Sequence, residues 1–333
     1  MSTPVPAKPH TDRLADFTRD TRILILALMA CAIGAVSAII AYILVKLIAL
    51  VTNVAFFQQF SFSDSSPANS SLGAWIILVP AIGGLIIGAM ARYGSERIRG
   101  HGIPEAIEAI LIGRSRMSPK VALLKPLSSA ISIGTGGPFG AEGPIIMTGG
   151  AFGSLFAQLF HLSAAERKTL LVAGAAGGMA AIFAAPVASV LLAIELLLFE
   201  WRPRSFIPVA ISAVVASVMR VPLLGEGPIF AVPFHGELAA GTIGIATAIG
   251  IAAGIGSVVL TMLVYSFEDL FLRLPFHWMW WPAIGGLAVG IGGLIDPRVL
   301  GVGYGVIHDL LLGQNLGGLL LSLLIVKALV WAI

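Results

Sequence analysis

GTGGPFGAEGP, from Gly134 to Pro144, is the stretch that decides the fold of this 333-residue chain. It places glycines and prolines inside an apolar sequence, and Glu142 is the only charged side chain between Lys125 and Glu166. An apolar run from Ile145 to Phe160 follows directly. The stretch therefore predicts the start of a helix in apolar surroundings, with Pro144 in the first turn, where its missing N–H does no harm.

The composition is that of a membrane protein. Hydrophobic residues make up 57% of the chain and charged residues 11%, against about 25% charged residues in soluble domains. A spanning helix needs roughly 20 apolar residues, and several runs reach that length. They are Ile23 to Val51, Leu72 to Ala91, Leu170 to Ile194 and Leu238 to Phe267. Shorter runs broken by Gly and Pro predict helices that stop part-way through the lipid bilayer, where protein or water covers the freed backbone.

The basic residues predict the orientation of the chain in the membrane. The net charge of +3 comes mostly from residues in short loops, so we expect no nucleic acid as a partner. Basic clusters precede the first apolar run and recur between Arg92 and Lys120, which places both regions in the cytoplasm by the positive-inside rule. The first 22 residues are polar and do not resemble a signal peptide. The single cysteine, Cys31, cannot form an internal disulfide.

The chain also contains an internal repeat. The segment PAIGGL at Pro80 to Leu85 recurs letter for letter at Pro282 to Leu287, an offset of 202 residues. The segment that starts at Gly100 resembles the one that starts at Gly301, after slips of one or two residues. Further on, Lys125 and Lys327 are again 202 residues apart. Duplicated halves with broken segments at matching positions are typical of transporters that bind an ion at the repeat interface.

The repeat suggests how the chain is divided. We expect a cytoplasmic segment at 1–20, a first transmembrane repeat at 21–222 and a second at 223–333. The second copy stops at Ile333, three residues before the counterpart of Gly134 should begin. We therefore expect the second repeat to be incomplete and the sequence to be a fragment of a longer protein. The alternative for the repeat as a whole is a duplicated structural bundle without an ion pathway.

Glu142 is the candidate gate. Helix starts expose unpaired N–H groups and carry about half a positive charge, so they attract anions. A carboxylate at such a start can occupy the place of a mobile anion, and it can move aside when it is protonated. The alternative is an acidic cap that only neutralises the helix dipole. Ionisable residues inside membranes are functional by default, and this favours the gate.

A second broken segment, GHGIPEA at Gly100 to Ala106, repeats the pattern. Pro104 and Glu105 suit the first turn of a helix. His101 either offers a ring N–H to an anion or is an ordinary solvated loop residue, and the sequence leaves both interpretations open. A third segment, Gly174 to Glu195, is dense in small residues, which favours close helix packing. Its Pro186 must kink or restart the helix.

These three segments, in this order, resemble the CLC family of chloride channels and proton-coupled chloride exchangers. The resemblance covers the chain from about Thr21 to Ile333. It implies a helical membrane bundle of inverted repeats that assembles as a homodimer, with one anion pore in each subunit. Chloride or a similar small anion, and in the exchangers protons, are the implied partners.

The resemblance also implies site residues. Glu142 matches the external gating glutamate, and the amides near Ala141, Glu142 and Gly143 match the outer anion site. His101, with Gly102 and Ile103, falls where the family binds the central anion and usually carries a serine, so the preference for chloride over nitrate is in doubt. Ala141 replaces a usual arginine, which removes a positive charge from the outer mouth.

A further departure from the family pattern concerns the transport of protons. Leu196 stands where the exchangers carry a second glutamate, and leucine cannot relay a proton. Glu195 is next to it, but neighbours on a helix point about 100° apart, so it would not simply substitute. Glu200 is another candidate for that role. The departure favours a channel-like protein over an exchanger.

We expect an all-α, multi-pass membrane protein of CLC type, in a bacterial inner membrane, that moves chloride through a pore gated by Glu142. A proton-coupled antiporter on the same scaffold and a non-transporting fragment are the alternatives. An enzyme, a metal site or a cofactor is not expected, because the sequence holds no HExxH, GxSxG or Cys/His cluster.

Overall fold

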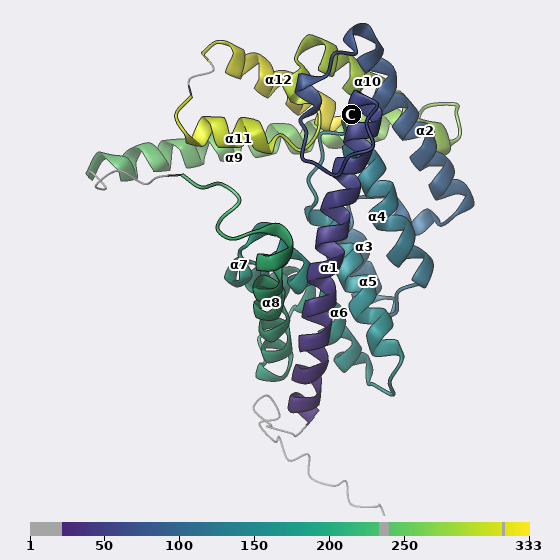
Figure 1. The fold of residues 1–333 in the computed structure, drawn as a ribbon, viewed down its shortest axis with the longest axis vertical. Helices are drawn as coiled ribbons and strands as arrows, with labels where there is room; N and C mark the ends of the chain where they lie inside the picture. The colour runs from purple at the N-terminus through teal and green to yellow at the C-terminus, as the bar shows by residue number, and fades with distance from the viewer. Residues whose placement is uncertain (1–21, 233–239, 315–316) are drawn as a thin grey trace, which may run out of the picture.

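The computed structural model describes residues 22–232, 240–314 and 317–333, and these parts of the chain are helical without any strand. The predicted cytoplasmic segment 1–20 lies outside the described residues. Short 3-10 turns join many of the helices, which are drawn in Figure 1. The helices are α1 (Arg22–Phe57), α2 (Leu78–Tyr93), α3 (Ile103–Leu111), α4 (Pro119–Gly134), α5 (Glu142–Gln158), α6 (Ala164–Phe183), α7 (Pro186–Ala193), α8 (Pro203–Leu224), α9 (Ala240–Leu272), α10 (Trp281–Ile295), α11 (Tyr304–Leu311) and α12 (Leu319–Ala332).

Within the described ranges, five helical segments are long and apolar enough to cross a membrane. They include α1, α2 with the 3-10 turn before it, and α9, which correspond to three of the four predicted runs. The fourth run, from Leu170 to Ile194, is divided between two helices, which agrees with the predicted kink or restart at Pro186. There α6 ends at Phe183, Ala184 takes a left-handed conformation, and α7 restarts at Pro186, because a proline cannot continue the hydrogen-bond ladder of a helix.

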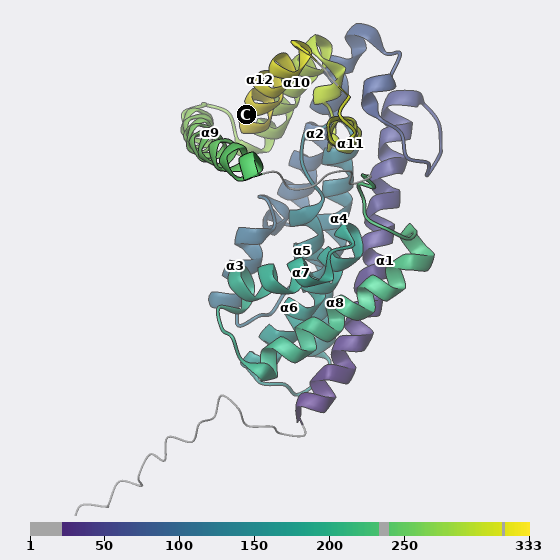
Figure 2. The ribbon, with the colours of Figure 1, turned by 90° about the vertical axis from the view of Figure 1, so that its left-hand side faces the viewer.

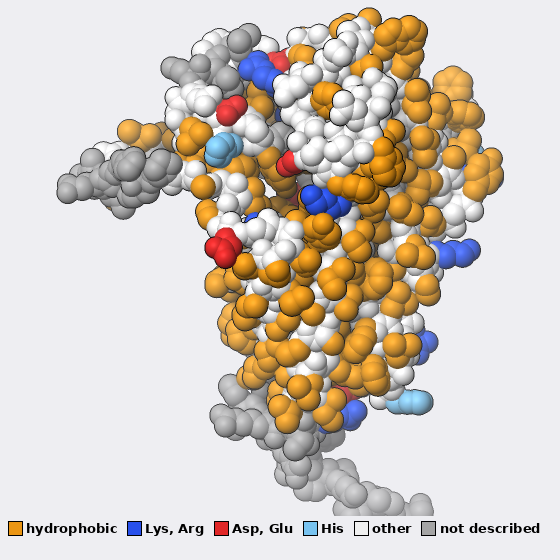
Figure 3. Space-filling view, viewed as in Figure 1, with side chains coloured by type: hydrophobic (Ala, Val, Ile, Leu, Met, Phe, Trp, Pro, Cys, Tyr) orange, Lys and Arg blue, Asp and Glu red, His pale blue; other side chains and the backbone are white. Residues whose placement is uncertain are grey.

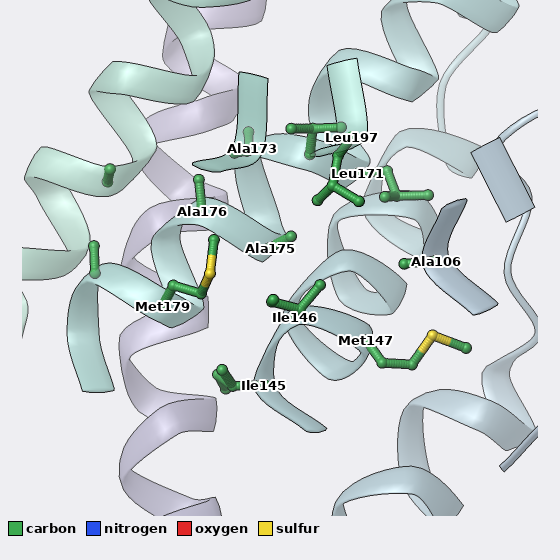
Figure 4. Close-up of a cluster of buried hydrophobic side chains, with 14 of the residues drawn as sticks. Ala106, Ile145, Ile146, Met147, Leu171, Ala173, Ala175, Ala176, Met179 and Leu197 are labelled. Carbon is green, nitrogen blue, oxygen red and sulfur yellow. The ribbon is translucent and has the colours of Figure 1, made fainter. Parts of the chain in front are cut away.

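The main core lies where α1, α5, α6 and α8 pack together in the lower part of Figure 1. Small residues bring the backbones close. A Cβ atom on Gly149 would overlap the carbonyl oxygen of Gly174, and a Cβ on Gly174 would overlap that of Gly149. Figure 4 shows buried aliphatic side chains of this core, among them Ile146 and Leu171. The prediction of close packing for the segment Gly174 to Glu195 is confirmed in its α6 part.

The two copies of PAIGGL cross each other in α2 and α10 with matching contacts. A Cβ on Gly84 would overlap the carbonyl oxygen of Pro282, and a Cβ on its repeat mate, Gly286, would overlap that of Pro80. The next pair behaves alike, since Gly88 meets the carbonyl of Met279 and Gly290 meets that of Ile77. All of these positions are related by the offset of 202 residues. The two helices are therefore related by a pseudo-two-fold axis that passes between them. The residue boundary at 222 between the repeats stays a prediction.

The surface of the bundle is mostly apolar. The face seen in Figure 3 shows hydrophobic side chains over most of its height and few charged ones. Helix α9 extends away from the lower bundle in Figures 1 and 2, and none of its described side chains is buried. A helix that is apolar on all sides and uncovered by protein suits contact with lipid. The chain is therefore an integral membrane protein with several spans.

Candidate anion site

The stretch Gly134 to Pro144 ends one helix and starts another, as its sequence predicts. Helix α4 closes at Gly134, and α5 opens at Glu142 with Pro144 in its first turn. Ala141 and Gly143 are buried, whereas the side chain of Glu142 is exposed. Its carboxylate folds back over Gly140, where a Cβ atom would overlap it. The charge therefore lies in front of the helix start and is not buried in the core.

The start of α3 is fixed by Glu105. Gly102 has φ +103°, a left-handed conformation that glycine adopts without strain. Its N–H donates to Oε2 of Glu105 at 2.6 Å, which closes the first turn, and Pro104 lies in that turn. His101 precedes it with an exposed side chain. The backbone of this turn is thus held in place, and the imidazole projects from a fixed position.

The starts of α3 and α5 touch each other. A Cβ on Gly102 would overlap the carbonyl oxygen of Gly143, and a Cβ on Gly143 would overlap that of His101. Only glycine at both positions allows this approach. The contact brings together two segments about 40 residues apart in the chain. Two helix starts, each with unpaired N–H groups and a partial positive charge, therefore meet at one place.

The second repeat adds a third helix start. The N–H of Gly301 donates to the carbonyl oxygen of Gly136 at 2.9 Å, which ties the turn before α11 to the turn before α5. Tyr304 is the first residue of α11, and its ring contacts that of Phe230 at 5.9 Å between centroids. Its hydroxyl is buried and has no hydrogen-bond partner among the described residues. The carboxylate of Glu142 lies close enough to act on it electrostatically.

Tyr304 was not predicted from the sequence. A signal was present, because the turn before it aligns with the turn that holds His101, and position 304 matches Ile103 in that alignment. The six predicted residues lie on the two helix starts that meet: His101, Gly102 and Ile103 on α3, and Ala141, Glu142 and Gly143 on α5. Ile103 is half-buried. In the part of the chain that the structure describes, no group of three His, Cys, Asp or Glu side chains could hold a metal.

The region of the expected proton relay lies at the end of α7. A π-helical turn from Ile194 to Leu198 extends that helix, with Glu195 exposed and Leu196 half-buried on it. Glu200 follows and accepts a hydrogen bond from Ser205 at 2.7 Å. Its carboxylate also lies 3.5 Å from Lys168, 3.6 Å from Arg202 and 3.9 Å from Arg204.

This environment decides the charge of Glu200. Burial acts to raise the pKa of its carboxyl, but the hydrogen bond from Ser205 and the nearby cations outweigh that effect, so the pKa lies below its ordinary value. Such a carboxyl stays ionised at neutral pH and holds its cations. The structure therefore does not favour the expectation that Glu200 takes up protons in place of Leu196.

Comparison with known proteins gives a consistent result. Residues 83–333 match the family model described as voltage gated chloride channel. The voltage-gated ClC-type chloride channel ClcB of Salmonella typhimurium is 32% identical over 79% of this chain and 63% of its own length. The H(+)/Cl(-) exchange transporter ClcA of Salmonella paratyphi B is 30% identical over 93% of this chain and 66% of its own length. The chain spans about three fifths of the length of the first of these curated relatives.

The fold has counterparts among solved structures. The crystal structure of a slow cyanobacterial Cl−/H+ antiporter superposes with a TM-score of 0.74 at 18% identity, over 92% of this chain and 73% of the other. At this identity the likeness concerns the fold alone. It agrees with the predicted bundle of broken helices and inverted repeats.

Proposed function

Since this chain belongs to the voltage-gated chloride channel family, we propose that it moves chloride or a similar small anion across a membrane through a site gated by Glu142. The observation that carries the proposal is the contact between Gly102 and Gly143, which joins two helix starts behind the Glu142 carboxylate. Helix starts bind anions through N–H groups and partial charges, and such spread charges hold an ion without trapping it.

The proposed ligands are the six residues on the two helix starts. The amides of Ala141, Glu142 and Gly143 would bind the anion on the outer side, and the turn with His101, Gly102 and Ile103 would bind it further in. The exposed imidazole of His101 would contact the anion and make binding depend on the size and shape of that anion. The absence of a basic side chain at Ala141 leaves the outer part of the site to backbone dipoles.

Glu142 would act by competition. As a carboxylate it is itself an anion and can occupy the α5 start, which excludes the transported ion. In the structure it lies instead against Gly140, clear of the core. Protonation removes its attraction to the helix start. Acid should therefore raise anion flux, and the uncharged Glu142→Gln variant should lose this dependence on pH.

Two modes of transport agree with this site. The half-buried leucine at 196 and the ionised state of Glu200 favour a channel that carries anions without protons. The similarity to a relative named as an exchange transporter favours coupling to protons. That relative is 30% identical, and the match covers 93% of this chain. In an exchanger the exposed Glu195 on the π-helical turn would be the remaining carboxylate at the end of α7.

We propose a multi-pass location in a bacterial inner membrane, since the similar curated relatives come from bacteria. We further propose that two copies assemble into a homodimer, as the family resemblance implies. Light scattering of the detergent-solubilised protein tests the assembly, and a molecular mass of one subunit would contradict it.

Proton movement into liposomes that contain the full-length protein is the test of mechanism. A chloride gradient is imposed at controlled voltage, and internal pH and chloride are recorded together. Chloride flux without proton movement establishes a channel. Uphill proton movement establishes an exchanger, and its loss in Glu195→Gln would assign the proton to that residue. If neither ion moves with wild-type protein, while a matched Glu142→Gln sample is equally inactive, the proposed function is wrong.

A further inference from the structure

Two lysines, Lys125 and Lys327, make the same contact in the two repeats. The ammonium of Lys125 donates to the carbonyl oxygens of Ile98 at 2.9 Å and Gly100 at 2.8 Å. The ammonium of Lys327 donates to the carbonyl oxygen of Gly301 at 3.1 Å. Gly100 and Gly301 begin the turns before α3 and α11. Each lysine therefore holds the turn that leads into one of the converging helix starts.

Neither ammonium has an ion-pair partner in the described ranges. The Lys125 side chain belongs to a residue only 3% exposed, and Lys327 is half-buried. No carboxylate of a described residue lies within 4.0 Å of either ammonium. Glu105 acts on Lys125 from a greater distance, and its Oε2 is already used by Gly102. Charges buried in a membrane protein are costly unless an opposite charge balances them.

The lysines also orient the peptides of the turns. In a trans peptide the carbonyl and the following N–H point in opposite directions. The Gly100 carbonyl faces Lys125, so the N–H of His101 points away from that lysine. The Gly301 carbonyl faces Lys327, so the N–H of Val302 points away likewise. Neither N–H has a hydrogen-bond partner among the residues that the structure describes.

We propose that Lys125 and Lys327 are positioning residues that supply the fixed positive charge balanced by the bound anion. Each ammonium turns one peptide so that an N–H donor is free, and it adds a positive potential behind that donor. The two repeats differ in the net positive charge that they place behind the site. The first carries Glu105, which offsets part of the charge of Lys125, whereas the matching position of the second repeat is Val306. The inference rests on the proposed anion site and assigns it charges on both repeats.

The test is the effect of chloride on thermal stability and on binding, measured on the full-length protein in detergent. A ligand that binds the folded state raises the melting temperature with its concentration. Chloride is titrated into wild-type protein, Lys125→Met, Lys327→Met and the control Lys46→Met. Lys46, on α1, also donates to a backbone carbonyl, that of Phe62 at 3.2 Å, but this carbonyl belongs to the segment after α1 and to neither of the turns before α3 and α11. Calorimetry gives the affinities.

Removing one of the two charges should weaken chloride binding about tenfold, as expected for a unit charge near the ligand. The chloride-dependent rise in melting temperature should shrink in Lys125→Met and Lys327→Met and stay unchanged in Lys46→Met. A merely structural lysine would instead lower the melting temperature equally at all chloride concentrations and leave the rise intact. That outcome overturns the proposal.

Two further variants keep the test decisive if a methionine variant does not fold. Lys125→Arg keeps the charge and should retain the chloride-dependent rise. Glu105→Gln keeps an acceptor for the Gly102 N–H and removes a negative charge, so chloride should bind more tightly. Weaker binding in Glu105→Gln contradicts the electrostatic role. If wild-type protein itself shows neither a chloride-dependent rise nor anion flux, the proposed function has failed. If wild type shows both and the lysine variants match it, only the present inference has failed.

Discussion

The carboxylate of Glu142 lies over Gly140, in the space that a side chain at that position would fill. The residue that we propose as the gate therefore has a resting place made by the absence of a Cβ atom two residues earlier. The remaining alternative, an acidic cap of α5, gives no role to this contact.

Gly140→Ala is expected to displace the carboxylate from its resting place. The added methyl group forces another side-chain rotamer, and a rotamer cost of about 1 kcal/mol changes populations roughly fivefold. We expect the carboxylate to move toward the α5 start and to reduce anion flux at neutral pH by about that factor. Flux should recover on acidification and in the double variant with Glu142→Gln. An unchanged flux in Gly140→Ala would show that this resting place is irrelevant to gating.

His101→Ser is expected to change the preference between chloride and nitrate. The turn is held by Lys125 and Glu105, so the substitution replaces an imidazole by a hydroxyl at a fixed backbone position. The exchange of one hydrogen-bond donor for another is worth about 1 kcal/mol, or roughly fivefold in preference. Flux under equal chloride and nitrate gradients measures it. Identical ratios before and after the change would assign His101 to an ordinary loop role.

Gly84→Ala and Gly286→Ala are expected to destabilise the protein by similar amounts. Each new methyl group meets a backbone carbonyl of the partner helix, which cannot move aside as a flexible side chain can. Overpacking of this kind costs about 1–3 kcal/mol. Gly250→Ala on α9, where no atom lies within 4 Å of the added Cβ, is the control and should be neutral or slightly stabilising. Thermal unfolding of the three variants compares them, and a large effect at only one of the paired glycines would count against the pseudo-two-fold relation.

The Glu200 cluster is expected to stabilise the protein at neutral pH and to lose its effect in acid. Because the folded state lowers the pKa of this carboxyl, its contribution is present above the unfolded-state pKa and disappears as pH falls through the folded-state value. The difference in melting temperature between wild type and Glu200→Gln should be constant near pH 7 and vanish at strongly acidic pH. A difference that grows on acidification would mean that the pKa is raised.

Much of the fold could be predicted because its determinants are local. The lengths of apolar runs and the positions of Gly and Pro indicate helices and their ends, and α5 begins at Glu142 as expected. In the run from Leu170 to Ile194, hydropathy alone suggests one span, whereas Pro186 predicts the restart of the helix that the structure contains. The site residues that we propose on α3 and α5 were predicted from short motifs and from the family resemblance.

Tyr304 was missed for a different reason. Its place beside the first repeat depends on the hydrogen bond between Gly301 and Gly136, which joins segments 165 residues apart. No local pattern encodes such a contact. The repeat did contain the relevant information, since it aligned the turn before Tyr304 with the turn that holds His101, but such an alignment does not reveal that the two repeats touch at Gly136 and Gly301.

The crossing of α2 and α10 limits how the protein can move. No layer of side chains separates the helices at Gly84 and Gly286, where the backbone of each lies directly on the other. Swinging one half of the molecule against the other as rigid bodies would either break these contacts or press carbonyl groups into a helix. For the transport that we propose, a rocking-bundle form of alternating access is therefore disfavoured. The gate that we propose requires no such movement, because its carboxylate only changes its rotamer.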